Sequence, residues 1–231
     1  MSALLPKVDL TPLIEAFRRN GPPNWQDLDA DFLLGPLVEI AESGIPTAWV
    51  PSAVVLEALI DADDADRPGV LLTHRAVVLE DCVRVCTEIT AVDLQEQVVL
   101  LREALEVAQN GHLAAAQALG ASIFDTTLRH TFKPTKLAGY YKAVKDAIED
   151  HHETAPLTNM RWGIVHAPAV LVLDMFLPGN PVPADFNRHA SVHAAGAVQY
   201  HPANALIALM LATSLLREAH EELSTQGTAT S

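Results

Sequence analysis

The feature that most constrains the fold is the apolar run at residues 203–216, "ANALIALMLATSLL". As a helix it is apolar on nearly every side, so it cannot lie on a protein surface in water. It is interrupted by Asn204, Thr213 and Ser214 and is shorter than the roughly 20 residues that cross a bilayer. We therefore predict that this segment fills the centre of a helical bundle.

The rest of the chain shows helical spacing between turn residues. Residues 93–111, "DLQEQVVLLREALEVAQNG", begin with a capping-box-like pair, Asp93 and Glu96, and end at a glycine. Residues 11–21 begin with Thr-Pro and end with Asn-Gly. Pro168 is expected to break the helical pattern of residues 157–176. No alternation typical of strands persists, and we predict an all-α fold.

Two breaks divide the pattern into segments. An acidic stretch at residues 61–69 is expected to form a turn closed by Pro68-Gly69, and a second break lies at residues 90–93. We predict an N-terminal helical extension at 1–92 and a functional helical bundle at 93–231. Two cysteines four residues apart, Cys82 and Cys86, are expected to be core residues of one helix face.

The charge is distributed unevenly. The net charge is -14, which argues against general coating of nucleic acid because phosphate contacts need clustered cations, and we expect no DNA partner. Residues 1–128 contain 7 Lys and Arg against 20 Asp and Glu, whereas residues 129–202 contain 7 against 6 and hold seven of the ten histidines. An anion site is therefore expected within 129–202. The opening residues lack the basic start of a signal peptide, so we expect a cytoplasmic protein that binds no membrane.

That region contains the segment 185–196, "DFNRHASVHAAG", for which three interpretations exist. His189 and His193 are one helical turn apart and would present paired imidazoles to a metal ion, with His166 or His201 as a third ligand. Alternatively, the histidines are structural groups near a helix end. In the third interpretation, Arg188 and His193 form an Arg-x4-His motif.

The third interpretation is favoured by the context of the motif. The order "NRHASVHAAG", a short loop "AVQYHP" and the apolar helix resembles the C-terminal half of a HEPN domain over residues 185–216. The resemblance implies an all-α, metal-independent endoribonuclease with no cofactor, acting as a toxin or phage-defence component. It also implies an antitoxin or regulatory protein as a further partner. The alternative is a non-catalytic helical protein that binds a partner through a HEPN-like fold.

The chemistry of the motif is compatible with RNA cleavage. A histidine, whose ordinary pKa is near 6.5, can remove or supply a proton, and a guanidinium can hold phosphate oxygens. Arg188 and His193 lie about 140° apart around a helix, so one helix does not aim both at one atom. HEPN domains pair two motif helices, and we therefore expect a homodimer. The predicted catalytic residues are Arg188, His193 and His189.

Residues around the motif complete the predicted site. We expect Tyr200, His201 and Asn187 to contact the RNA substrate and no residue to hold a metal ion. A second Arg-x4-His spacing, Arg161 to His166, is interpreted as coincidence. Asp125 and Arg129, four residues apart, are expected to form a structural ion pair. Patterns of ATPases, α/β-hydrolases and zinc ribbons are missing from the sequence.

Overall fold

The computed structural model describes residues 21–28, 34–133, 139–154, 160–177 and 179–229, and in these ranges every regular element is a helix. The all-α prediction is therefore confirmed for the described residues. The helix predicted from residue 11 lies outside them. The helices are α2 (Pro23–Gln26), α3 (Leu34–Glu42), α4 (Ala53–Ile60), η1 (Asp64–Asp66), α5 (Arg67–Thr73), α6 (Arg75–Thr87), η2 (Val92–Leu94), α7 (Gln95–Gln109), α8 (Leu113–Phe132), α9 (Tyr140–Thr154), α10 (Met160–Val172), α11 (Arg188–His193) and α12 (Pro202–Ala229).

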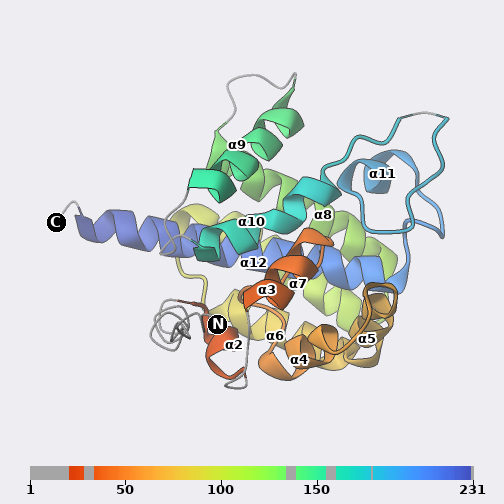
Figure 1. Ribbon diagram of the computed structural model, residues 1–231, viewed down its shortest axis with the longest axis horizontal. Coiled ribbons are helices and arrows are strands. Elements are labelled where there is room, and N and C mark those ends of the chain that lie inside the picture. The colour runs from red at the N-terminus through yellow and green to blue at the C-terminus, as the bar shows by residue number, and fades with distance from the viewer. Residues whose placement is uncertain (1–20, 29–33, 134–138, 155–159, 178, 230–231) are drawn as a thin grey trace, which may run out of the picture.

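Helix α12 runs through the middle of the molecule, and the other helices are arranged around it (Figure 1). Its apolar run is buried from Ala203 to Leu216, as predicted from its composition. The most extensive packing is against α8, where Gly120 faces α12: a Cβ at this position would meet backbone atoms of Ala208 at 3.3 Å. The small residue at Gly120 therefore lets the two helix backbones approach closely.

The two predicted segments share one core. Helix α12 packs on α5 and α6 from the first segment and on α7 and α8 from the second. One hydrophobic cluster contains side chains from Trp25 to Ala219, including both cysteines, which are buried thiols as expected. The structure thus shows a common core, and the functional division after residue 92 stays a prediction.

Three local predictions about helix ends are wrong. Pro68 and Gly69 do not close a turn but lie at the start of α5, where proline is tolerated because the first helical N–H has no partner within the helix. Asp93 lies in η2, and α7 has no side-chain cap. Pro168 lies inside a continuous α10. All residues of α10 from Gly163 to Ala169 are buried, so packing outweighs the cost of the proline.

The motif segment lies at the edge of the bundle. Helix α11 follows a long loop from the end of α10 and is seen apart from the central helices at one side of Figure 1. It packs on α8. The chain therefore places its predicted motif on a short peripheral helix directly before the central, buried one. Among the described residues, no helix combines the length and apolar composition that crossing a lipid bilayer requires.

Candidate functional site

Helix α11 begins at a side-chain cap. Asn187 has an extended backbone, and its Oδ1 accepts a hydrogen bond from the backbone N–H of Ala190 at 2.7 Å. Its Nδ2 donates to the backbone carbonyl of Asp174 at 2.9 Å, and the side chain is buried. Both ends of the amide are thus used within the protein. Asn187 fixes the start of the motif helix, and it also lines a hollow formed with the loop before α11.

Buried amides hold the other side of α11. The Oε1 of Gln199 accepts from the backbone N–H of Asn187 at 3.0 Å and from Oγ of Ser191 at 3.1 Å. Gln117, on α8, donates to Ser191 Oγ at 3.2 Å and to the backbone carbonyl of Gln199 at 3.0 Å. These buried polar groups are costly to leave unpaired, so the network fixes α11 on α8 although the helix is peripheral.

Arg188 points from α11 toward α8 and α9. Its Nη2 lies 3.0 Å from Oδ2 of Asp125, and its guanidinium carbon lies 5.5 Å from the centre of the Tyr141 ring. The side chain is 18% exposed, and Nε is buried with no hydrogen-bond partner among the described residues. Arg188 is thus anchored through one terminal nitrogen.

Asp125 is the centre of this contact. It also accepts from Nε of Arg129 at 2.9 Å and from the Tyr141 hydroxyl at 3.2 Å. The predicted ion pair of Asp125 and Arg129 is therefore confirmed, but the sequence did not show that Arg188 and Tyr141 join it. Burial, followed by the charge of Asp125, raises the pKa of Tyr141, so its hydroxyl remains a donor. We call Asp125, Arg129, Tyr141 and Arg188 the Asp125 cluster.

The two histidines of α11 lie side by side. The ring centres of His189 and His193 are 4.5 Å apart, as expected for residues one turn apart. Burial lowers the pKa of His189, and the neighbouring His193 and Arg188 lower it further, while the backbone of Phe176 opposes the shift. His189 is therefore neutral at neutral pH, and His193 is exposed to solvent.

The loop after α11 returns beside the helix. The Tyr200 hydroxyl donates to the backbone carbonyl of Ser191 at 2.5 Å. His201 is exposed, and its Nδ1 accepts from the backbone N–H of Ala203 at 3.3 Å, where α12 begins. Arg188, His189 and His193 are thus together on α11 and Tyr200 contacts that helix, whereas His201 caps the next one.

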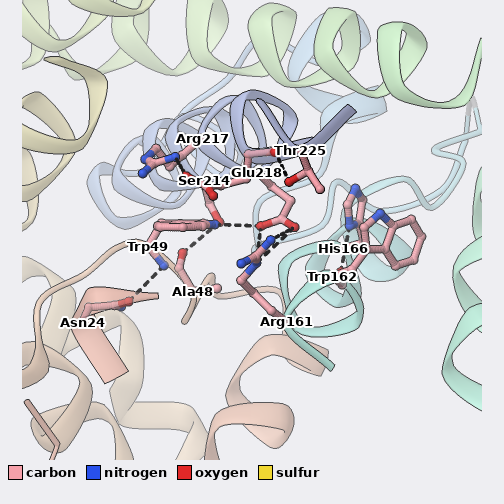
Figure 2. A network of polar contacts seen from close by, with 11 residues as sticks. Asn24, Ala48, Trp49, Arg161, Trp162, His166, Ser214, Arg217, Glu218 and Thr225 are labelled. Atoms are coloured by element: carbon pink, nitrogen blue, oxygen red, sulfur yellow. Dashed lines mark hydrogen bonds and ion pairs between the residues drawn. The ribbon is translucent and has the colours of Figure 1, made fainter. Parts of the chain in front are cut away.

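The second Arg-x4-His segment lies in a different environment (Figure 2). Arg161 binds Glu218 of α12 with two nitrogens, Nε to Oε2 at 2.9 Å and Nη2 to Oε1 at 3.1 Å. The Glu218 side chain is 3% exposed and also accepts from Nε1 of Trp49 at 3.0 Å. His166 is 1% exposed and stacks on Trp162 with ring centres 4.0 Å apart. This segment contributes to the core.

The backbone of Trp49 adopts a conformation that is unusual for a bulky residue. Its φ is +68°, in the left-handed region. Asn24 Oδ1 accepts from its backbone N–H at 3.1 Å, and the Arg217 guanidinium lies 4.3 Å from the centre of its ring. These contacts hold the strained residue in place. This network could not be predicted from the sequence because its members lie far apart in the chain.

Comparisons with known proteins identify no relative. The chain matches no protein-family model, no curated protein and no solved structure at a significant level. Within the described ranges, no group of three or more His, Cys, Asp or Glu side chains is arranged to hold a metal ion. The chemistry available to this protein is therefore inferred from the geometry of α11 and the Asp125 cluster.

Proposed function

We propose that this protein is a metal-independent endoribonuclease of HEPN type. The observation that carries the proposal is the arrangement on α11, where two imidazoles with ring centres 4.5 Å apart adjoin a partly buried guanidinium. The helix lies at the edge of the bundle, so a polymer can approach it. The contrast with Arg161, which binds both oxygens of the buried Glu218, and with the buried His166 supports α11 as the working copy of the motif.

The local charge supports binding of a phosphate. The Asp125 cluster contains two guanidinium groups and one carboxylate, which leaves one positive charge beside the histidines. Asp125 holds Arg188 through Nη2 only. The ion pair orients the guanidinium but leaves its other N–H groups without a carboxylate partner among the described residues. Such a group can stabilise the extra negative charge in a phosphoryl-transfer transition state.

The residues of α11 supply both proton transfers. We assign the general base to His189, whose lowered pKa keeps the ring neutral, so that it can remove the proton of a ribose 2′-hydroxyl. The 2′-oxygen then attacks the adjacent phosphorus, and the bond to the 5′-oxygen breaks. His193 in the protonated form gives its proton to that leaving oxygen. The products are a 2′,3′-cyclic phosphate and a 5′-hydroxyl.

A second copy of the chain is part of the proposal. Val192 lies between the two histidines in the sequence and is 55% exposed, and Val198, in the following loop, is similarly exposed. An interface formed through α11 would remove these two apolar side chains from water. Pairing two α11 helices across a two-fold axis would bring His193 of one copy near Arg188 of the other. Loss of the dimer by Val192→Lys, measured by light scattering, should accompany loss of cleavage.

The test is RNA cleavage in the presence of a chelator. Wild type is compared with Arg188→Ala and His193→Ala, and His112→Ala serves as the control because His112 is an exposed histidine at the start of α8. We expect wild type and control to release cyclic phosphate ends, and both motif variants to be slower by about 100-fold or more. Thermal unfolding of each variant shows that the fold is retained. Equal rates for all four proteins would contradict the proposal.

The alternative function is binding of a protein partner without catalysis. The ion pair of Arg188 with Asp125 favours it, because a structural arginine needs no further ligand. In that case wild type leaves RNA intact, and Val192→Lys weakens assembly alone. Cleavage that stops when the chelator is added would instead support paired His189 and His193 as metal ligands.

A further inference from the structure

Three adjoining hollows lie along the C-terminal end of α10 and the loop that follows it. The first, of about 530 Å³, lies between α3, α9 and α10; the second is about 230 Å³ and the third about 170 Å³. Leu171 lines all three, Asp174 is shared by the first two, and Phe186 by the last two. The shared residues place the three hollows next to one another; together we call them the α10 groove, and the second hollow is also lined by the capping residue Asn187.

The floor of the α10 groove is apolar and accessible. Leu171 is 39% exposed and Met175 is 64% exposed. Ala167 and Val170 extend the apolar wall in the first hollow, and Phe186 does so in the other two. An occupant with apolar side chains would remove this surface from water, which is favourable in proportion to the area covered.

The rim of the groove is acidic. Five carboxylates and one ammonium line the three hollows: Glu42, Asp64, Glu149, Asp174, Asp185 and Lys145. Lys145 forms an ion pair with Asp174, so the first hollow already contains an alkylammonium group seated on a carboxylate beside an apolar wall. The same chemistry suits lysine side chains of another molecule.

We propose that the α10 groove binds a basic, amphipathic peptide segment of a partner protein, with its apolar side chains on Leu171 and Met175 and its cations on the surrounding carboxylates. The length of the groove favours an extended segment, because a small cation would occupy one hollow only. The acidic rim repels RNA and anionic lipid surfaces. The groove also includes the loop that leads into α11, but the inference uses none of the catalytic assignments to Arg188, His189 and His193.

Fluorescence anisotropy with defined peptides tests this. The probe is a labelled 12-residue peptide in which lysine and leucine alternate, and a lysine–serine peptide of equal charge is the reference. The groove variant carries Glu42→Gln, Glu149→Gln and Asp185→Asn. The matched control carries Glu96→Gln, Glu103→Gln and Glu106→Gln, which remove the same charge from exposed positions on α7.

We expect the groove variant to bind the lysine–leucine peptide about tenfold more weakly than wild type, and the control to change binding by less than about twofold. Leu171→Ser should weaken binding of the lysine–leucine peptide and leave binding of the lysine–serine peptide unchanged. Equal losses in the groove variant and the control would show attraction by net charge alone and would overturn the proposal. Equal affinity of the two peptides for wild type would contradict the proposal that apolar side chains bind on Leu171 and Met175. Displacement of the peptide by spermidine at the same concentration would show a site for small polycations instead.

Discussion

The chain contains the spacing Arg-x4-His twice, and the two copies differ in how their arginine and histidine side chains are held. In α10, Arg161 binds both oxygens of a buried carboxylate and His166 is packed against Trp162. In α11, Arg188 reaches its carboxylate through one nitrogen and His193 is exposed. The spacing alone therefore does not make a site: of the two copies, only the one in α11 combines a guanidinium nitrogen without a partner among the described residues with an exposed imidazole.

The difference begins with the elements that carry the two motifs. Helix α10 has buried residues from Gly163 to Ala169 and packs on α3, α9 and α12, so its polar side chains must find partners inside the protein. Helix α11 has only six residues and is held by a cap and by buried amides of its neighbours. Because these contacts use backbone groups and Ser191, the helix is fixed while His193 stays exposed to solvent.

The largest expected difference concerns the two arginines. Arg161→Met leaves Glu218 buried with Trp49 as its remaining donor, and we expect the free energy of unfolding to fall by about 3 kcal/mol. Arg188→Met leaves Asp125 with Arg129 and Tyr141, and a loss of about 1 kcal/mol is expected. Urea denaturation of both variants measures this.

A second variant separates the buried charge from packing. Adding Glu218→Gln to Arg161→Met removes the unpaired carboxylate, so the double variant should recover part of the lost stability. If Arg161→Met and Arg188→Met lower the free energy of unfolding equally, the two arginines do not differ in structural role, and this comparison is contradicted.

The histidines should show a smaller difference of the same kind. His166→Ala removes a buried ring that stacks on Trp162 and contacts Phe132, and we expect a loss of about 2 kcal/mol. His193→Ala removes an exposed ring, so the change should stay within about 0.5 kcal/mol. Thermal unfolding curves compare the two variants. A large loss for His193→Ala would mean that it is a structural residue.

The sequence predicted those features that depend on local composition. The burial of residues 203–216 followed from an apolar surface on all sides, and the ion pair of Asp125 and Arg129 from i,i+4 spacing. The continuous helix through Pro168 could not be predicted in this way, because its burial outweighs the preference of proline.

Contacts between residues far apart in the chain could not be predicted from the sequence either. Glu218 is 169 residues from Trp49 and 57 from Arg161, and no periodicity connects them. Arg188 is 63 residues from Asp125, so the sequence showed the motif without the carboxylate that orients it. A tryptophan with positive φ is also invisible in a sequence, since glycine is the residue that normally marks this conformation.

The smallest expected effect is the pH dependence contributed by His189. Burial, His193 and Arg188 lower the pKa of His189 in the folded protein below its ordinary value of 6.5. Above pH 6.5 the ring is neutral in both states and contributes nothing. As the pH falls below 6.5, the unfolded chain takes up the proton first, so the folded state loses stability until the pH passes the folded pKa.

His189→Asn should therefore lose less stability than wild type between about pH 6.5 and 5. His112→Asn is the control, because it removes an exposed histidine elsewhere. Parallel stability curves for wild type and His189→Asn would show that His189 is not desolvated on α11, and the assignment of the general base would then pass to His193.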